Sequence, residues 1–311
     1  MSRLVIFVIL VMISAVFPSY KWYTVPSPTT HDINDIELHS SFGLMAANGA
    51  AAGYHLGDWL LSPIPNDSLN LQGISGLYWY CLVVAVAPNG DCIGYDWGWH
   101  TMSCPTSQDL NDLYIGDISF GICVGNQVLL NLTSFNWQIL NPGYTANWKC
   151  VWGNIDKTSE MWIGGSGGKI LKRLGSNWTQ YLCPTSATIT GIAFTTPPFG
   201  YACSDTGQIF KYDGSVWSLV SQPNTIPLNS IWLADATHGF AVGNNGRIMQ
   251  FDGTNWTIYP NSPTTKDLNT VSMVDNTFGF IGGDDGVLLK YGLDDSVEAT
   301  TLGNIKASFV R

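Results

Sequence analysis

The chain has 311 residues, of which 23 are acidic and 13 are Lys or Arg, so its formal net charge is −10 at pH 7. This excess of carboxylates argues against nucleic acid and against an anionic membrane surface as partners, because both demand a cationic footprint. Charged residues make up 12% of the chain, about half the globular average, so the surface must consist mainly of Ser, Thr, Asn and Gly.

The chain begins with an apolar segment. Arg3 is followed by the uncharged stretch from Leu4 to Phe17. This stretch is shorter than the about 20 residues that a membrane-spanning helix needs, and its length is typical of a secretory signal. We therefore expect residues 1–19 to be a cleaved signal peptide, with no stable membrane insertion afterwards and an uncleaved anchor as the alternative. A signal peptide predicts a secreted or other extracytoplasmic location, at the cell surface or in the periplasm.

The most informative pattern downstream is a tryptophan that recurs at intervals of about 40 residues. The positions are Trp22, Trp59, Trp99, Trp137, Trp178, Trp217 and Trp256. A fixed interval of this length predicts stacked copies of one small unit. Each Trp lies in the predicted fourth strand of its unit, and Trp178, Trp217 and Trp256 are followed by Thr or Ser, so we expect all seven to pack between units. Multivalent sugar binding is the alternative for this set.

One copy shows the unit most clearly. Residues 228–233, 239–243, 247–251 and 255–259 each read as a short strand. The turns between the last three contain Gly246 and Gly253, because primed hairpin turns need residues that adopt positive φ. Four short strands joined by tight turns at this period describe one blade of a β-propeller.

The two ends of the repeat predict how the ring closes. The last copy runs from Leu268 to Tyr291, and no Trp follows ten residues after Gly286. Residues 21–32 instead echo residues 254–267. We therefore predict an all-β, seven-bladed β-propeller with four-stranded blades over residues 20–292, in which the N-terminal strand completes the last blade. Residues 293–311 are expected to be a polar C-terminal tail.

The repeat signature resembles a known family. Residues 239–248 read Gly-Phe-Ala-Val-Gly-x-x-Gly-x-Ile, and residues 251–256 read Phe-Asp-Gly-x-x-Trp. This is similar to the photosystem II stability/assembly factor type of seven-bladed propeller, which is related to the BNR/Asp-box propellers. The resemblance covers nearly all of residues 20–292. It implies an extracytoplasmic assembly factor for a membrane complex. Assembly factors of this type carry an arginine-rich patch on their own surface, and the arginines of this chain beyond residue 19 are Arg173, Arg247 and Arg311.

Two details qualify the family comparison. In the Asp-box pattern Gly lies two residues after Asp, whereas Asp252 and Gly253 are adjacent here and Trp256 lies four after Asp252. The tail from Gly292 to Lys306 weakly resembles the linker before a type IX secretion sorting domain, although the chain ends without the strand that such a domain begins with.

The cysteines do not suggest a metal or a cofactor. The seven are Cys81, Cys92, Cys104, Cys123, Cys150, Cys183 and Cys203. No CxxC motif occurs and no Cys–His spacing is typical of zinc, so we expect no metal and no cofactor. Most should be small buried residues, and one disulfide is the alternative in an oxidising compartment.

No catalytic constellation stands out. A sialidase-like site needs three convergent arginines, and an endoglucanase-like site needs two carboxylates that face one cleft. Most aspartates occupy turn positions, where Asp is expected for backbone reasons. The five histidines show no pairing with a serine or cysteine nucleophile. We therefore favour a non-catalytic protein- or glycan-binding module that acts as a monomer, with a carbohydrate-active enzyme as the alternative.

Two candidate binding sites follow from the repeat. Polar residues at the starts of the inner strands should surround one mouth of the channel: Asp32, Asn34, Asp35, Asp109, Asn111, Asp112, Asn229, Asp267 and Asn269. They predict either an acidic rim for a cation, a sugar or a basic protein loop, or side chains that satisfy turn amides. An aromatic concentration in the second blade is the candidate sugar-stacking patch: Tyr78, Trp79, Tyr95 and Trp97.

Overall fold

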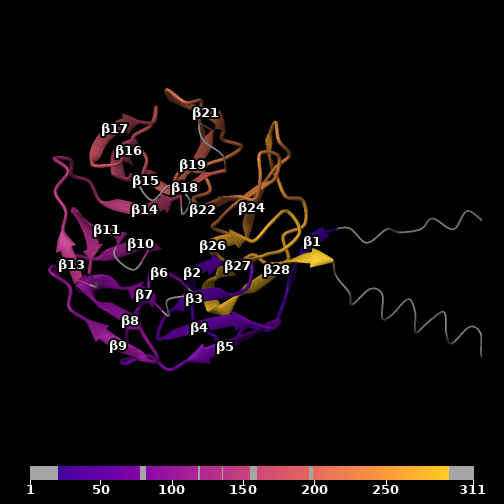
Figure 1. The fold of residues 1–311 in the computed structure, drawn as a ribbon. Helices are drawn as coiled ribbons and strands as arrows, with labels where there is room; N and C mark the ends of the chain where they lie inside the picture. Colours follow the sequence, from indigo (N-terminus) through magenta and orange to yellow (C-terminus); the bar gives the residue numbers. More distant parts are fainter. Residues whose placement is uncertain are drawn as a thin grey trace, which may run out of the picture.

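The computed structural model describes residues 20–77, 82–117, 120–134, 136–154, 160–195 and 199–293. Within these ranges the chain forms seven four-stranded antiparallel sheets. The sheets stand as blades around a central channel, with their order in space following their order in the sequence (Figure 1). The all-β, seven-bladed propeller predicted from the repeat is confirmed.

Each blade begins with an inner strand at the channel and ends with an outer strand. Blade 1 is β2 (Ile33–Leu38), β3 (Gly43–Ala47), β4 (Ala50–His55) and β5 (Asp58–Ser62). Blade 2 is β6 (Gly73–Leu77), β7 (Leu82–Val86), β8 (Cys92–Tyr95) and β9 (Trp99–Met102). Blade 3 is β10 (Leu110–Asp117), β11 (Phe120–Gly125), β12 (Val128–Thr133) and β13 (Asn136–Ile139). Blade 4 is β14 (Trp148–Gly153), β15 (Glu160–Gly165), β16 (Lys169–Leu174) and β17 (Asn177–Leu182).

Blades 5 and 6 follow the same order. They are β18 (Ile189–Phe194), β19 (Gly200–Ser204), β20 (Ile209–Tyr212) and β21 (Trp217–Ser221), and then β22 (Leu228–Leu233), β23 (Gly239–Gly243), β24 (Arg247–Phe251) and β25 (Trp256–Ile258). Blade 7 is β26 (Leu268–Met273), β27 (Gly279–Gly283), β28 (Leu288–Leu293) and β1 (Tyr20–Thr24). Single 3-10 turns lie at η2 (Pro88–Gly90), η3 (Ser166–Gly168) and η4 (Asp284–Gly286).

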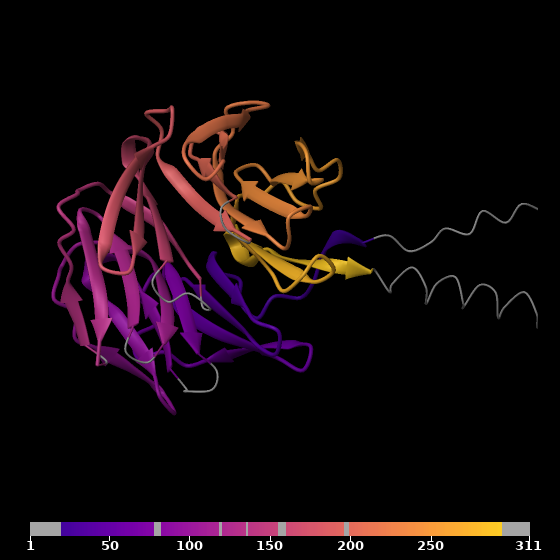
Figure 2. The same cartoon turned by 45° about the horizontal axis from the view of Figure 1, so that its top comes forward.

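The ring closes where the two ends of the described chain meet. β1 pairs antiparallel with β28, and Trp22 lies opposite Tyr291. In both views the indigo N-terminal strand lies beside the yellow C-terminal strand (Figures 1 and 2). The predicted closure by the N-terminal strand is therefore confirmed. The predicted signal peptide, and the tail beyond Leu293, lie outside the described residues.

The core is divided into clusters that join neighbouring blades. Each periodic Trp begins or lies near the start of an outer strand, and several pack against an aromatic ring of the preceding blade. Trp22 of blade 7 lies 5.1 Å from Phe240 of blade 6, and Trp256 of blade 6 lies 5.5 Å from Tyr201 of blade 5. Such contacts hold adjacent sheets at a fixed angle, because aromatic pairs bury much area and prefer specific geometries.

An irregularity recurs at the channel. In six inner strands the pairing with the second strand skips one residue, and β6 is the inner strand whose pairing has no such shift. The skipped residues are Asn34, Asn111, Lys149, Thr190, Asn229 and Asn269. A β-bulge leaves this residue unpaired and re-aims its side chain. Two consecutive side chains can then face the neighbouring blade.

Candidate functional site: the central channel

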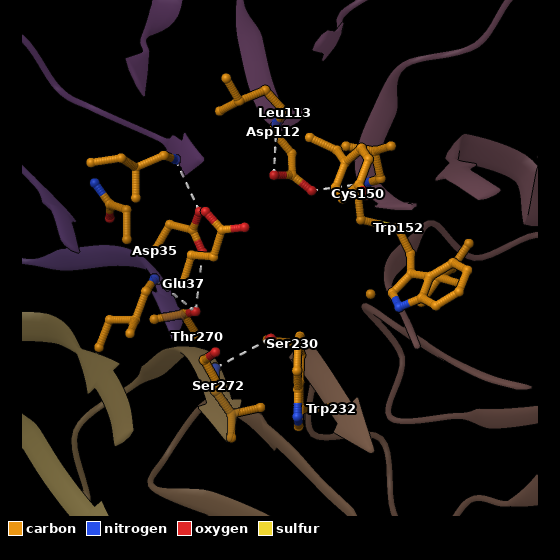
Figure 3. Close-up of a pocket in the computed structure, with 18 of the residues that line it drawn as sticks. Asp35, Glu37, Asp112, Leu113, Cys150, Trp152, Ser230, Trp232, Thr270 and Ser272 are labelled. Atoms are coloured by element: carbon orange, nitrogen blue, oxygen red, sulfur yellow. Dashed lines mark hydrogen bonds between the residues drawn. The ribbon is translucent and has the colours of Figure 1, made fainter. Parts of the chain in front are cut away.

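The candidate site is the cavity at the centre of the ring. It has a volume of about 350 Å³ and is lined by residues from all seven inner strands. Figure 3 shows its residues pointing inward from several blades around an open centre. Each inner strand is the edge of its own sheet, so its outward N–H and C=O groups have no backbone ladder with the next blade.

The bulge residues connect the inner strands in place of a backbone ladder. Four Asn amides and one Thr hydroxyl each donate to a backbone carbonyl at the start of the next inner strand or, for Asn34, two residues before it, at distances of 2.6 to 3.2 Å. The donors are Asn34, Asn111, Thr190, Asn229 and Asn269. The fourth of these bonds joins blade 6 to blade 7, and the last joins blade 7 to blade 1. The four predicted rim asparagines therefore serve as links between blades.

The residue after four of the six bulges makes a second link in the opposite sense, by accepting a hydrogen bond from the next inner strand. Asp35 accepts a hydrogen bond from the Ile74 amide at 3.0 Å, and Asp112 accepts one from the Val151 amide at 2.8 Å. Ser230 and Thr270 occupy the same place and accept from residues of the next inner strand. Edge amides that would otherwise be unsatisfied thus find acceptors on the preceding blade, as buried backbone groups require.

The three remaining rim aspartates lie just before the inner strands and bind a turn of the preceding blade. Asp32 accepts from the Asp285 amide at 2.9 Å, Asp109 from the Asn89 amide at 3.1 Å, and Asp267 from the Asn245 amide at 2.7 Å. The donors all have positive φ, between 54° and 62°. Each carboxylate therefore stabilises a left-handed turn residue, which is costly for a residue other than glycine.

Burial and mutual repulsion perturb the carboxyl groups inside the channel. Burial, helped by the charge of the nearby Glu37 carboxylate, raises the pKa of Asp35 to about 7 against the opposing hydrogen bonds. Burial, followed by the charge of Asp35, raises the pKa of Asp112 well above its usual range. Low dielectric disfavours the charged form of a carboxyl group, and a like charge adds to this effect. Near neutral pH the channel therefore carries fewer negative charges than its composition suggests.

Glu37 is a partly accessible carboxylate of the channel, with 23% of its side chain exposed. It accepts from the Gly76 amide at 3.0 Å and lies 3.4 Å from the His39 imidazole. Burial lowers the pKa of His39, but the hydrogen bond and the charge of Glu37 outweigh burial and the net shift is upward. Lys149, on the other side of the channel, has a pKa lowered by burial and donates to Asn111 at 3.1 Å.

The opposite wall is aromatic. Trp152 of β14 and Trp232 of β22 also line the cavity, at the right and at the bottom of Figure 3, while Asp35 and Glu37 of β2 lie at its left. Trp152 packs against Phe194 at 5.1 Å, and the buried Trp232 indole N–H has no hydrogen-bond partner. The channel thus combines carboxylates on one side with two indole rings on the other, a lining that suits a group with an apolar body and a polar or cationic end.

The predicted aromatic patch is only partly within the described residues, because Tyr78 and Trp79 lie outside them. Tyr95 is half-buried and contacts Trp99 at 5.5 Å. Trp97 lies at the β8–β9 turn with a positive φ of 86° and 90% of its surface exposed. Leu56 at the corresponding turn of blade 1 also has positive φ and is 91% exposed. These two exposed side chains lie away from the channel lining.

A metal site, an arginine patch and a membrane-spanning helix were each sought within the described ranges. No cluster of three or more His, Cys, Asp or Glu in this part of the chain could hold a metal ion. Arg173 of blade 4 stacks on Phe120 of blade 3 and on Trp178 of its own blade, and Arg247 lies on β24 of blade 6, so the two do not form the arginine patch that the family resemblance implies. No helix within the same ranges is long and apolar enough to cross a membrane.

Comparison with known proteins supports the fold. The sequence matches no protein-family model and no curated relative at a significant level. A solved structure titled "YCF48 bound to D1 peptide" is 15% identical with a TM-score of 0.72, covering 90% of this chain and 96% of that one. YCF48 from Cyanidioschyzon merolae is 17% identical with a TM-score of 0.69, covering 87% and 98%.

The WD40 β-propeller domain of Doa1 is similar to the same degree, with 12% identity, a TM-score of 0.70 and coverage of 90% of this chain and 99% of the domain. The chain is therefore a seven-bladed β-propeller that is structurally similar to YCF48. At these identities the likeness shows the fold alone.

Sequence reasoning did not place three of the residues that give the site its character in the channel. Glu37, Trp152 and Trp232 occupy the same position of three inner strands, two residues after Asp35, Cys150 and Ser230 respectively. Residues two apart on a strand share a face. Alignment of the inner strands by this period was therefore a signal that could have found them.

Proposed function

We propose that this protein is a non-catalytic propeller that binds a segment of a protein partner at the mouth of the channel. The observation that carries the proposal is the lining described above, with Glu37 partly exposed on one wall and Trp152 and Trp232 on the other. A Lys or Arg side chain would place its stem along the indole rings and its charged end at Glu37. The similarity to a propeller solved with a bound peptide supports a polypeptide ligand.

The hydrogen bonds of the buried carboxyl groups favour binding over hydrolysis. A glycosidase needs one carboxylate to attack or activate water and one carboxylic acid to protonate the leaving group, both facing the substrate. Asp35 accepts bonds from Ile74 and Thr270, and Asp112 accepts bonds from Val151 and Leu113. These contacts hold the two side chains between blades rather than toward a ligand.

A glycan ligand is the second candidate, and Trp97 favours it. An exposed indole beside Tyr95 offers a ring face for sugar stacking, although its site would lie on blade 2 and outside the channel. We further propose an extracytoplasmic location, which is supported by the apolar segment from Leu4 to Phe17 and by the low content of charged residues.

A library of short random peptides displayed on phage, and a glycan array probed in parallel, test the proposed function. We expect enriched peptides to share a Lys or Arg at one position. Glu37→Gln should weaken binding of such a peptide at least about tenfold, since a hydrogen bond to a charged group contributes about 1.5–3 kcal/mol. Asp58→Asn, an exposed change on β5, is the matched control. Glycan binding without peptide enrichment, or polysaccharide turnover lost in a single Asp→Asn variant, would overturn the proposal.

A further inference from the structure

Two cysteines of blade 2 lie at the β8–β9 hairpin and contact the same core cluster. Cys92 on β8 pairs with Met102 on β9, and Cys104 follows two residues later. Directly opposed residues of antiparallel strands share a face, so Cys92 and Met102 lie on the same face of the hairpin, and Cys104 lies two residues beyond the end of β9. Cys92 is buried in the cluster between blades 2 and 3, and Cys104 packs against that cluster while remaining partly exposed. Both are free thiols in the structure.

Blade 4 provides an internal comparison. Cys183 follows Trp178 by five residues, as Cys104 follows Trp99. The residue that corresponds to Cys92 in blade 4 is Ile170, two residues after the positive-φ Gly168. Ile170 and Cys183 are buried in one core cluster. The repeat therefore places these two equivalent positions in the same core cluster of a blade, and in blade 2 both positions are cysteines.

The two thiols of blade 2 differ in reactivity. A hydrogen bond between the two thiols lowers the pKa of Cys104 against the opposing effect of burial. The same bond and burial raise the pKa of Cys92. A thiolate is the attacking species in thiol–disulfide exchange, so the more exposed Cys104 is suited to react first with a reagent from solution.

We propose that Cys92 and Cys104 form a disulfide when the protein meets a small-molecule disulfide such as glutathione disulfide. The Cys104 thiolate attacks one sulfur of glutathione disulfide, which forms a mixed disulfide and releases one glutathione thiolate. Cys92 then loses its proton to solvent and attacks the Cys104 sulfur, which releases the second glutathione. Two protein thiols are oxidised and one glutathione disulfide is reduced to two glutathione molecules.

The bond would close a loop around an exposed part of the molecule. Tyr95, Trp97 and the β8–β9 turn lie between the two cysteines. A disulfide restricts the unfolded chain and holds the end of β9 to β8, so it should stabilise this hairpin. An oxidising compartment, which the apolar N-terminal segment predicts, would favour the bonded form.

Mass spectrometry of the full protein tests the assignment. The protein is incubated with glutathione disulfide, its remaining thiols are alkylated, and it is digested without reduction. We expect one pair of peptides joined through Cys92 and Cys104, with Cys183 alkylated as the internal control. The melting temperature should rise by several degrees on oxidation of the wild type and of Cys183→Ala, and should not change on oxidation of Cys104→Ser or Cys92→Ser.

Three results would overturn the proposal. The first is a stable glutathione adduct on Cys104 with Cys92 alkylated. The second is a bond from Cys104 to another cysteine, such as Cys81 or Cys123. The third is alkylation of both Cys92 and Cys104 after oxidation. Comparison of oxidised and reduced forms within each variant separates the effect of the bond from any cost of the substitution itself.

Discussion

At the scale of single residues, Asp35 shows how the propeller uses polar groups at its channel. Its carboxyl group accepts a hydrogen bond from the Ile74 amide of blade 2 and another from the Thr270 hydroxyl of blade 7, at 3.0 and 3.2 Å. One side chain therefore joins three neighbouring blades. The bonds favour the ionised form, but burial dominates and the pKa rises to about 7.

The raised pKa of Asp35 predicts a pH dependence of stability. Between the unfolded pKa near 3.8 and the folded pKa near 7, the folded protein retains a proton that the unfolded chain releases. Raising the pH through this window therefore favours unfolding, with a slope of up to about 1.4 kcal/mol per pH unit from this group. Asp35→Asn should reduce the slope of the unfolding free energy, measured by urea denaturation at several pH values.

The exposed Asp58→Asn provides the control for this experiment, because its environment on β5 is open to solvent. Part of the slope should persist in Asp35→Asn, since Asp112 is also buried with a raised pKa. An unchanged slope in Asp35→Asn would show that its carboxyl group does not titrate in this window.

At the scale of elements, β1 is the strand that connects the two ends of the chain. It supplies the outer strand of blade 7, and Trp22 is buried against Phe240 and Tyr291 at ring distances of 5.1 and 5.0 Å. The Trp22 amide also donates to the Tyr259 hydroxyl of the neighbouring blade. The strand therefore contributes backbone pairing, a buried ring and a contact between blades.

Deletion of Tyr20 to Ser27 should destabilise the protein by more than about 3–5 kcal/mol, since removal of one buried Trp side chain already costs this much. β28 would also become an exposed edge, which favours association between molecules. The free energy of unfolding in urea and the size distribution by light scattering measure the two effects. Deletion of residues 294–311 is the matched control, and equal stability of the two truncated proteins would contradict this role for β1.

At the scale of the whole molecule, the ring is held by contacts between blades that are successive in sequence, together with the single junction of blade 7. Tyr20 lies opposite Leu293 at the open end of that junction. Tyr20 and Leu293 therefore occupy the place where each of the other blades has a tight turn between its third and fourth strands.

A circular permutant follows from this geometry. It begins at Pro28, continues to Leu293, and then runs through a two-residue Asn-Gly turn into Tyr20 to Ser27. Asn-Gly favours the primed turn that connects paired strands. We expect its melting temperature to lie within a few degrees of the wild type, with the same near-UV circular dichroism. Loss of the near-UV signal would show that closure depends on the native chain order.

Much of this architecture was predictable because its signals are local. Gly246 and Gly253 mark turns through their own backbone preferences, and the Trp interval repeats one unit of structure. The absence of a Trp ten residues after Gly286 predicted the closure, since a missing strand at one end had to be supplied by the other. Each of these inferences needs only the neighbours of a residue along the chain.

The roles of the rim residues depended on the tertiary structure. Asn34 and Leu71, which form one link between blades, are 37 positions apart, and no local pattern names such a partner. Asp35 could equally have faced a ligand until the neighbouring strand brought the Ile74 amide to it. The sequence by itself thus determined the blades and their closure through turn chemistry and periodicity. Only the packing of one blade on the next decided which polar groups bind backbone and which, like Glu37, remain open to the channel.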